Sequence, residues 1–300
     1  MTVADREIES TSLGKISLPG HREAPRAIQF SGDNRALVTG SDAIKVWSVE
    51  SCKCVRTVPM VQPVTCVEYC IGDRQLVAGS KSGSLYIIDI ASAEVIQEIA
   101  DAHEGEIWQI KKHKGDWATV GTDGSLKLWK LDFKGDSISM SLKKTLKLSE
   151  SALSVEFTPD KKFIAVALLD STVKVFYRDT LKFWNSLYGH QLPVNCLAAS
   201  SDSTLMATGS ADRSVKLWGM DFADCHKSFL AHDKAVVSVS WVTDTHLLFS
   251  MAKDGEIKQW DGDKFKLIQK LNGHHDEINA GLCSYNGDLV CSVSKDKSIR

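Results

Sequence analysis

Histidine, aspartate and hydroxyl side chains recur along this chain at fixed distances from one another. A His–Asp pair beside a hydroxyl is the arrangement of nucleophilic catalysis, and the same donor types also ligate metals. In five segments a histidine is followed 20–22 residues later by an aspartate, with a serine or threonine three or four residues before it. The sets are His21, Thr39 and Asp42; His103, Thr119 and Asp123; His190, Thr208 and Asp212; His232, Ser250 and Asp254; and His274, Ser292 and Asp296.

Repetition argues against a catalytic or metal-binding role for these sets. One active site needs one set, whereas five sets at one spacing indicate a structural unit that is repeated. The chain also lacks the G-x-S-x-G, H-E-x-x-H, Walker A and G-x-G-x-x-G motifs. The cysteines lie in alternating apolar patterns without matching Cys or His pairs, which favours reduced thiols. We therefore expect no catalytic residue, no metal and no cofactor, and an enzyme is the least favoured hypothesis.

The elements that would position these sets are short strands in repeated units. Each unit has a strand that ends in small polar residues, a turn that holds the aspartate, and an alternating strand that closes on a large residue. Successive closing residues are 41–47 residues apart, close to the roughly 40–45-residue period of a WD-repeat blade. They are Trp47, Ile88, Trp129, Phe176, Trp218 and Trp260.

The chemistry of the markers explains why they occur together. An imidazole can donate to the carboxylate and accept from the hydroxyl, while the tryptophan packs between blades and donates its N–H. We predict an all-β fold, a seven-bladed WD-repeat β-propeller with four antiparallel strands per blade. Two blades depart from the pattern. The second (61–100) has no histidine and has Gly83 at the expected aspartate position, and the fourth (about 149–189) keeps Asp170 but lacks the histidine.

One domain is expected, covering residues 13–300, with the last blade cut at Arg300 before its outer strand. Residues 13–18 precede the first Gly-His pair as outer strands do in the other units. They are expected to pair with the last blade and close the ring, which removes two exposed sheet edges. Residues 1–12 are expected to be a flexible tail or the end of a linker.

Composition limits the class of partner. The net charge is −2 and the pI about 6.5, which argues against a wholly basic nucleic-acid binder. No apolar run approaches the roughly 18 residues of a membrane span, and the polar N-terminus is unlike a signal peptide. We expect a soluble intracellular protein with no membrane partner and no small-molecule substrate.

Positions that differ between blades are the candidates for partner binding. The residue five after each histidine is expected near the rim of the central channel, and Trp108 there is a candidate interface anchor. Packing of Trp108 against the neighbouring blade is the open alternative. The candidates at this position are Arg26, Trp108, Asn195 and Asn279, with Val237 at the fifth.

An insertion of about five residues lengthens the segment 130–148. Its lysines make it a candidate docking loop for acidic protein or RNA phosphate, and a longer solvated hairpin is the open alternative. The lysines are Lys130, Lys134, Lys143, Lys144 and Lys147.

Several stretches are more particular than the repeat. They are SLPGHR (17–22), LLDSTVKVFYRDTLKFWNSLYGHQLPV (168–194), TGSADRSVKLWGMDFADCHKSFLAHD (208–233), GEIKQWDGDKF (255–265) and LNGHHDEI (271–278). In order and spacing they resemble the second propeller of a family of nucleolar WD-repeat proteins of the small-subunit processome. Members of that family also have a preceding propeller and a C-terminal helical domain, neither of which is expected within residues 1–300.

The resemblance implies a non-catalytic scaffold in small-subunit ribosomal RNA maturation, located in the nucleus and nucleolus. It implies other WD-repeat processome subunits as partners, with U3 small nucleolar RNA and pre-ribosomal RNA bound directly or indirectly. The alternative is a cytoplasmic adaptor that reads peptides on the propeller face, since one fold hosts many functions.

Overall fold

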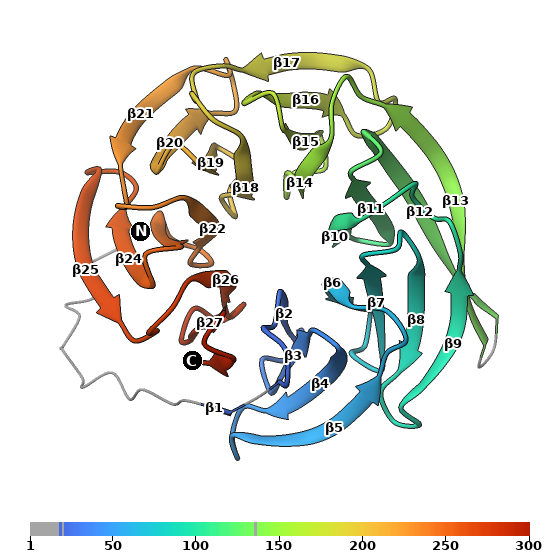
Figure 1. Ribbon diagram of the computed structural model, residues 1–300. Helices are drawn as coiled ribbons and strands as arrows, with labels where there is room; N and C mark the ends of the chain where they lie inside the picture. The colour runs from blue at the N-terminus through green and yellow to red at the C-terminus, as the bar shows by residue number, and fades with distance from the viewer. Residues whose placement is uncertain (1–17, 20, 135–136) are drawn as a thin grey trace, which may run out of the picture.

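The computed structural model describes residues 18–19, 21–134 and 137–300, in which every regular element is a β-strand. The strands form seven four-stranded antiparallel sheets arranged as blades in a ring (Figure 1). The first three blades are β2 to β13: Ala27–Phe30, Ala36–Gly40, Ala43–Ser48 and Lys53–Pro59; Val64–Tyr69, Gln75–Ser80, Leu85–Asp89 and Glu94–Ile99; Ile107–His113, Asp116–Gly121, Ser125–Lys134 and Ser137–Lys147.

The next three blades are β14 to β25, and the seventh combines β26 to β28 with β1 from the other end of the chain. The predicted seven-bladed all-β propeller is therefore confirmed. The remaining strands are Ala152–Phe157, Phe163–Leu168, Val173–Tyr177 and Phe183–Leu187; Val194–Ala199, Leu205–Ser210, Ser214–Gly219 and Cys225–Leu230; Val236–Trp241, Leu247–Ala252, Glu256–Asp261 and Lys266–Asn272; Ile278–Cys283, Val290–Ser294, Ser298–Ile299 and Leu18–Pro19.

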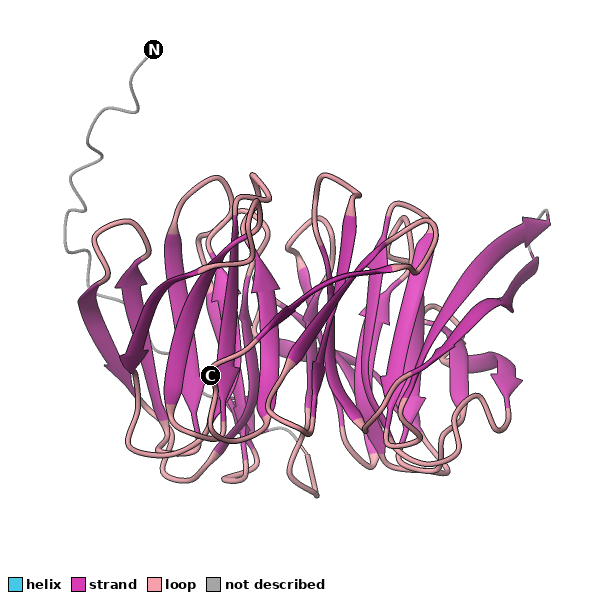
Figure 2. Cartoon of the chain, turned by 90° about the horizontal axis from the view of Figure 1, so that it is seen from above, coloured by secondary structure: helices cyan, strands magenta, loops and turns pink. Residues whose placement is uncertain are grey.

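The first strand of each blade lies nearest the ring axis and the fourth lies on the outside (Figure 1). Strands run between two faces of the ring, and the connecting turns lie on those faces (Figure 2). We call the face with the turns between second and third strands the upper face, because these turns contain the aspartates. The lower face has the other turns within the blades.

The hydrophobic core is a series of layers between adjacent blades. One layer joins Val120 and Leu126 of the third blade to Val155 and Ile164 of the fourth. Inner strands such as β6 and β7 are buried along almost their whole length because a blade packs on each face. Outer strands such as β5 and β9 are largely exposed, so the apolar runs of the sequence mark the inside of each blade.

The ring closes by pairing the two ends of the chain. Leu18 lies opposite Ile299 and Pro19 opposite Ser298 in antiparallel register. This matches the predicted closure at residue 18, while residues 13–17 and the predicted tail 1–12 lie outside the described residues. Pro19 fits this position because an edge strand has one side free of ladder hydrogen bonds.

The insertion at 130–148 forms a long hairpin. Its strands, β12 and β13, have 10 and 11 residues, against 2 to 7 residues in the other strands described. The hairpin packs on the second blade: Leu131, Ile138 and Met140 are buried in one cluster with Val77 and Ile87. The segment is thus a long hairpin, partly packed on the second blade, and its role as a docking loop stays a prediction.

The state of the cysteines and the presence of a membrane-spanning helix can both be checked in the structure. All eight cysteines are free thiols, and four of them are buried: Cys66, Cys70, Cys196 and Cys283. Within the described ranges no helix is long and apolar enough to cross a membrane.

Candidate interaction surface

The predicted His–Asp–hydroxyl sets form hydrogen-bonded networks in the third, fifth, sixth and seventh blades. In the fifth blade, His190 Nδ1 lies 2.8 Å from Asp212 Oδ2, and Nε2 lies 2.7 Å from Thr208 Oγ1. The Trp218 N–H donates to the same hydroxyl at 2.9 Å. These contacts assign the proton to Nδ1, so the imidazole donates to the carboxylate and accepts from the threonine.

The other networks have the same geometry. The third blade joins His103 to Thr119 at 2.7 Å and to Asp123 at 3.0 Å; the sixth joins His232 to Ser250 at 2.8 Å and to Asp254 at 2.9 Å; the seventh joins His274 to Ser292 at 2.7 Å and to Asp296 at 2.9 Å. Trp129 and Trp260 donate to the hydroxyls as Trp218 does. The four histidine side chains are at most 2% exposed, and these sets tie the second strand, the turn and the entering loop together.

The first blade departs from the expected network. His21 Nε2 lies 2.7 Å from Thr39 Oγ1, and Trp47 donates to that hydroxyl at 2.9 Å, as predicted. His21 Nδ1, however, lies 3.8 Å from Asp42 Oδ1 and has no hydrogen-bond partner. The inclusion of Asp42 in the network was therefore wrong. The turn is one residue shorter here, which leaves the Asp42 side chain 41% exposed.

The second blade corrects the position of its turn. Gly83 has φ +92° and donates its N–H to the Ser80 carbonyl, as Gly124 (φ +63°) does to Gly121 in the third blade. Gly83 thus matches the residue after the aspartate, and Ser82 stands at the aspartate position. The placement of Gly83 there was wrong by one residue. In the fourth blade Asp170 accepts from the backbone N–H and hydroxyl of Thr172.

Burial and hydrogen bonding shift the network pKa values. Burial penalises the imidazolium and lowers the pKa of His103, His190 and His274, and it lowers the pKa of His21 to about 4. Burial alone would raise the pKa of Asp212, but hydrogen bonds from Ser214, the Gln191 N–H and His190 hold it at about 2. The folded state therefore favours neutral histidine beside ionised aspartate.

These shifts predict a loss of stability in acid. A lowered histidine pKa means that the unfolded chain binds more protons, so stability is complete above the ordinary histidine pKa of 6.5 and falls as pH decreases toward about 4. We expect the thermal midpoint, followed by circular dichroism, to fall steadily from about pH 7 to about pH 4.5. A midpoint that is constant or rises over this interval would contradict the assigned network.

His246 provides the control for that measurement. Burial alone would lower its pKa, but Asp263 at 2.6 Å and Asp202 at 3.1 Å raise it above 6.5. Its contribution has the opposite sign, being present below pH 6.5 and lost as pH rises through the folded pKa. His246→Gln should therefore make the acid loss steeper.

The residue five after each histidine lies at the start of the first strand of its blade, or just before it in the first blade. A β-bulge occurs there in six blades, at Thr65, Trp108, Leu153, Asn195, Val237 and Asn279. A bulge adds one residue to a strand and turns its side chain out of the ladder.

Several of these side chains connect neighbouring blades. Asn195 donates to the Val236 carbonyl at 2.7 Å, and Asn279 donates to the Pro25 carbonyl at 2.9 Å across the ring closure. Thr65, which sequence reasoning did not single out, donates to the Ile107 carbonyl. The two asparagines thus have a structural role in holding blade to blade, which their positions in the sequence did not indicate.

Arg26 and Trp108, which occupy this position in the first and third blades, are accessible to solvent. Trp108 is 39% exposed, and the Arg26 side chain is 56% exposed and forms an ion pair with Glu106 at 3.3 Å. The exposed indole fits the anchor interpretation better than full packing against the next blade.

Sequence reasoning missed other apolar side chains on the upper face. Val61 is 92% exposed in the loop before β6, Leu169 lies in the upper turn of the fourth blade, and Leu192 precedes β18. In the sequence, the only sign of their exposure is their position in loops next to the networks. We define the upper-face patch, which spans the first to fifth blades, as Arg26, Val61, Trp108, Leu169 and Leu192.

Four lysines of the hairpin have partners within the propeller. Lys143 pairs with Asp116 at 3.3 Å, and Lys144 donates to the Asp179 carbonyl. Lys130 pairs with Asp132 at 2.6 Å, and Lys147 donates to the Asp123 carbonyl. The side chain of Lys134 lies outside the described part of the hairpin.

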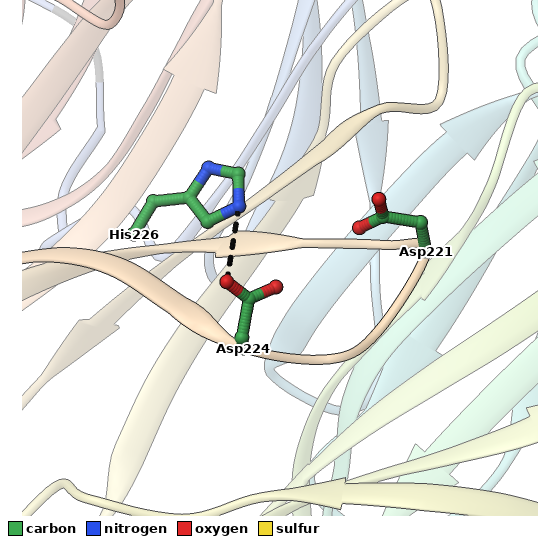
Figure 3. A group of neighbouring side chains, drawn as sticks. All are labelled: Asp221, Asp224 and His226. Atoms are coloured by element: carbon green, nitrogen blue, oxygen red, sulfur yellow. Dashed lines mark ion pairs between the residues drawn. The ribbon is translucent and has the colours of Figure 1, made fainter.

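Two carboxylates and an imidazole meet on the lower face, in the DFADCH stretch that follows β20 and includes the first two residues of β21 (Figure 3). The ligand atoms of Asp221, Asp224 and His226 lie within 4.8 Å of one another, and His226 is 3.4 Å from Asp224. A second group, His232, Asp254 and Glu256, belongs to the network of the sixth blade. The first group has a donor set suitable for a divalent cation, but all three residues are exposed on one turn, and such groups are common without an ion. We assign no metal to it.

The seven four-stranded blades with repeated His–Asp–hydroxyl–Trp networks define a WD-repeat β-propeller. Within this class, residues 25–300 match the family model described as the WDR3 second beta-propeller domain, and the chain belongs to that family.

Named relatives share this sequence over part of their length. WD repeat-containing protein 3 of Mus musculus and that of Homo sapiens are each 45% identical over 189 residues, covering 60% of this chain and 20% of the relative. U3 small nucleolar RNA-associated protein 12 of Saccharomyces cerevisiae is 38% identical over 195 residues, again 60% of this chain and 20% of the relative. The chain therefore matches about a fifth of the length of these proteins.

Proposed function

We propose that this propeller is a non-catalytic scaffold domain in the maturation of small-subunit ribosomal RNA. It acts in the nucleolus by holding other WD-repeat subunits of the small-subunit processome. The family match over residues 25–300 carries the proposal, and the yeast relative named for association with U3 small nucleolar RNA supports it. The buried, mutually bonded histidines and aspartates favour a structural use over catalysis.

The upper-face patch is the surface that we propose for protein contact. Its exposed tryptophan and arginine are residue types enriched at the energetic centres of interfaces. Contact with RNA is proposed to be indirect, because Lys130, Lys143 and Lys147 are already bound to acceptors in the propeller.

The test is affinity purification of the tagged full-length protein from its own cells, with and without RNase, followed by mass spectrometry and RNA sequencing. Processome WD-repeat subunits with U3 RNA and pre-ribosomal RNA are the expected result, and RNase should remove the RNA but leave the subunits. Recovery of a cytoplasmic partner alone, unaffected by RNase, would instead support the peptide-reading adaptor.

Trp108→Ala tests the surface. Loss of an aromatic anchor costs about 2 kcal/mol of binding, or roughly 30-fold in affinity, so recovery of the WD-repeat partners should fall strongly. Phe222→Ala is the matched control, because Phe222 is 79% exposed on the opposite face. Equal recovery from both variants, with unchanged thermal midpoints, would exclude the patch as the docking surface.

A further inference from the structure

The second and third blades form a groove on the side of the propeller. A cavity of ≈ 380 Å³ lies between β9 and the β12–β13 hairpin, within the range of about 300–1,000 Å³ typical of binding pockets. Its apolar lining consists of Ile99, Ala102, Trp129, Met140 and Leu142. In Figure 1, β13 and β9 follow one another along the outer side of the ring. We call this cavity the side groove.

At Met140 the outer edge of β13 is already paired, in the manner of an adjacent strand, by a side chain of the second blade. The Met140 N–H donates to Gln97 Oε1 at 2.9 Å, and Gln97 Nε2 donates to the Met140 carbonyl at 3.4 Å. A single side-chain amide thus supplies the two hydrogen bonds that a residue of an adjacent antiparallel strand would supply. Gln97 belongs to the second blade, so the long hairpin is fixed beside the groove.

The edge continues past Met140 to Leu142. Met140 lies opposite Leu131 and Leu142 opposite Trp129, and alternate residues of a strand direct their backbone groups the same way. The N–H and carbonyl of Leu142 therefore also face outward from β12. Its side chain lines the groove and is 52% exposed, so a backbone edge and an apolar surface occur together.

The charges around the groove indicate the chemistry of the partner. Glu98 and Asp101 are exposed at the groove, whereas Lys127, the one lysine or arginine among its described lining residues, donates to the Ala102 carbonyl. The charged lining thus consists of two carboxylates and one ammonium group that already has a hydrogen-bond acceptor. A partner with basic side chains complements the two carboxylates of the lining, because the neighbouring Lys143 of β13 is already paired with Asp116.

We propose that the side groove binds an extended segment of a partner protein, apolar at alternate positions and rich in lysine or arginine. The segment adds a strand to the outer edge of β13, and every second side chain enters the groove beside Trp129 and Leu142. The inference concerns a different surface from the upper-face patch and does not depend on the proposed function in ribosome assembly.

The test is selection from a library of random peptides about nine residues long, enough for one strand of ordinary length, against the whole purified chain. Leu142→Glu is the counter-selection target. Enriched peptides should alternate apolar and other residues with an excess of lysine and arginine. A synthetic enriched peptide should bind Leu142→Glu at least about tenfold more weakly than the unaltered chain.

Two variants separate the groove from general effects on folding or charge. Val55→Glu is the matched control, because Val55 is 47% exposed on the outer strand of the first blade. The affinity of this variant for the peptide should equal that of the unaltered chain. Asp101→Lys leaves the apolar lining intact and should weaken the basic peptide. Hydrogen exchange should show slower exchange of the Leu142 amide when the peptide is bound.

Three results would overturn the proposal. They are no enrichment over the Leu142→Glu target, enrichment of acidic peptides, or exchange at the Leu142 amide that the peptide does not slow. Each is independent of the affinity purification, so the groove and the ribosomal role can fail separately.

Discussion

Asp212→Ala is expected to lower the free energy of unfolding by about 1–3 kcal/mol, the usual effect of leaving buried polar groups without a partner. The Asp212 carboxylate accepts from His190, the Gln191 N–H, and the hydroxyl and backbone N–H of Ser214, and alanine removes all four contacts. The buried imidazole would then have only the Ser214 hydroxyl, 3.2 Å from Nδ1, as an acceptor for its proton. Urea denaturation at neutral pH measures the change.

Asp42→Ala is the matched control in the first blade. This aspartate occupies the same kind of turn, but it lies 3.8 Å from His21 and its side chain is 41% exposed. Substitution should change stability by less than about 0.5 kcal/mol. If both alanine variants lost stability equally, hydrogen bonding to histidine would not be the cause of the Asp212 effect.

Gly83→Ala is expected to have the larger effect on stability, about 2–5 kcal/mol, the sum of a backbone cost and an overpacking cost. The residue has φ +92°, where a side chain costs about 1–2 kcal/mol, and a Cβ would lie 2.1 Å from the His103 carbonyl oxygen. That oxygen belongs to the backbone leading into the third blade, so the two blades would have to separate, which adds the roughly 1–3 kcal/mol typical of overpacking. The thermal midpoint and urea denaturation both report the loss.

Gly72→Ala distinguishes backbone strain from the close approach. Gly72 has φ +83°, but no atom lies within 4 Å of the position that an added methyl group would take. Only the cost of the left-handed conformation should therefore appear, about 1–2 kcal/mol. Similar losses for both glycines would mean that the contact between the second and third blades relaxes freely.

The repeat itself could be predicted because its markers lie within one blade. Thr208 and Asp212 follow His190 by 18 and 22 residues, and the hairpin register brings the three together in every blade that keeps the spacing. The order of strands follows from the same spacing, and closure of the last blade by a segment near the N-terminus follows from counting the strands of that blade. Local pattern and antiparallel pairing are sufficient for these features.

Turn length limited the prediction within the blade. One residue fewer at Asp42 removes a hydrogen bond that the spacing pattern implied, and one residue of misalignment exchanged Ser82 and Gly83. The sequence shows which residues are near a turn, but the backbone angles of the turn determine which side chain reaches the histidine.

By itself, the sequence determined the number of blades, their antiparallel strands and the residues of four complete networks, since these depend on periodicity along the chain. Only the tertiary structure decided that Asn195 and Asn279 join blades, that Trp108 is exposed, and that Gln97 pairs with the backbone of Met140. The physical reason is that these contacts lie between blades. Their atoms come from strands about 40 residues or more apart, and the lateral packing of one sheet on the next, which no periodicity encodes, sets their distances.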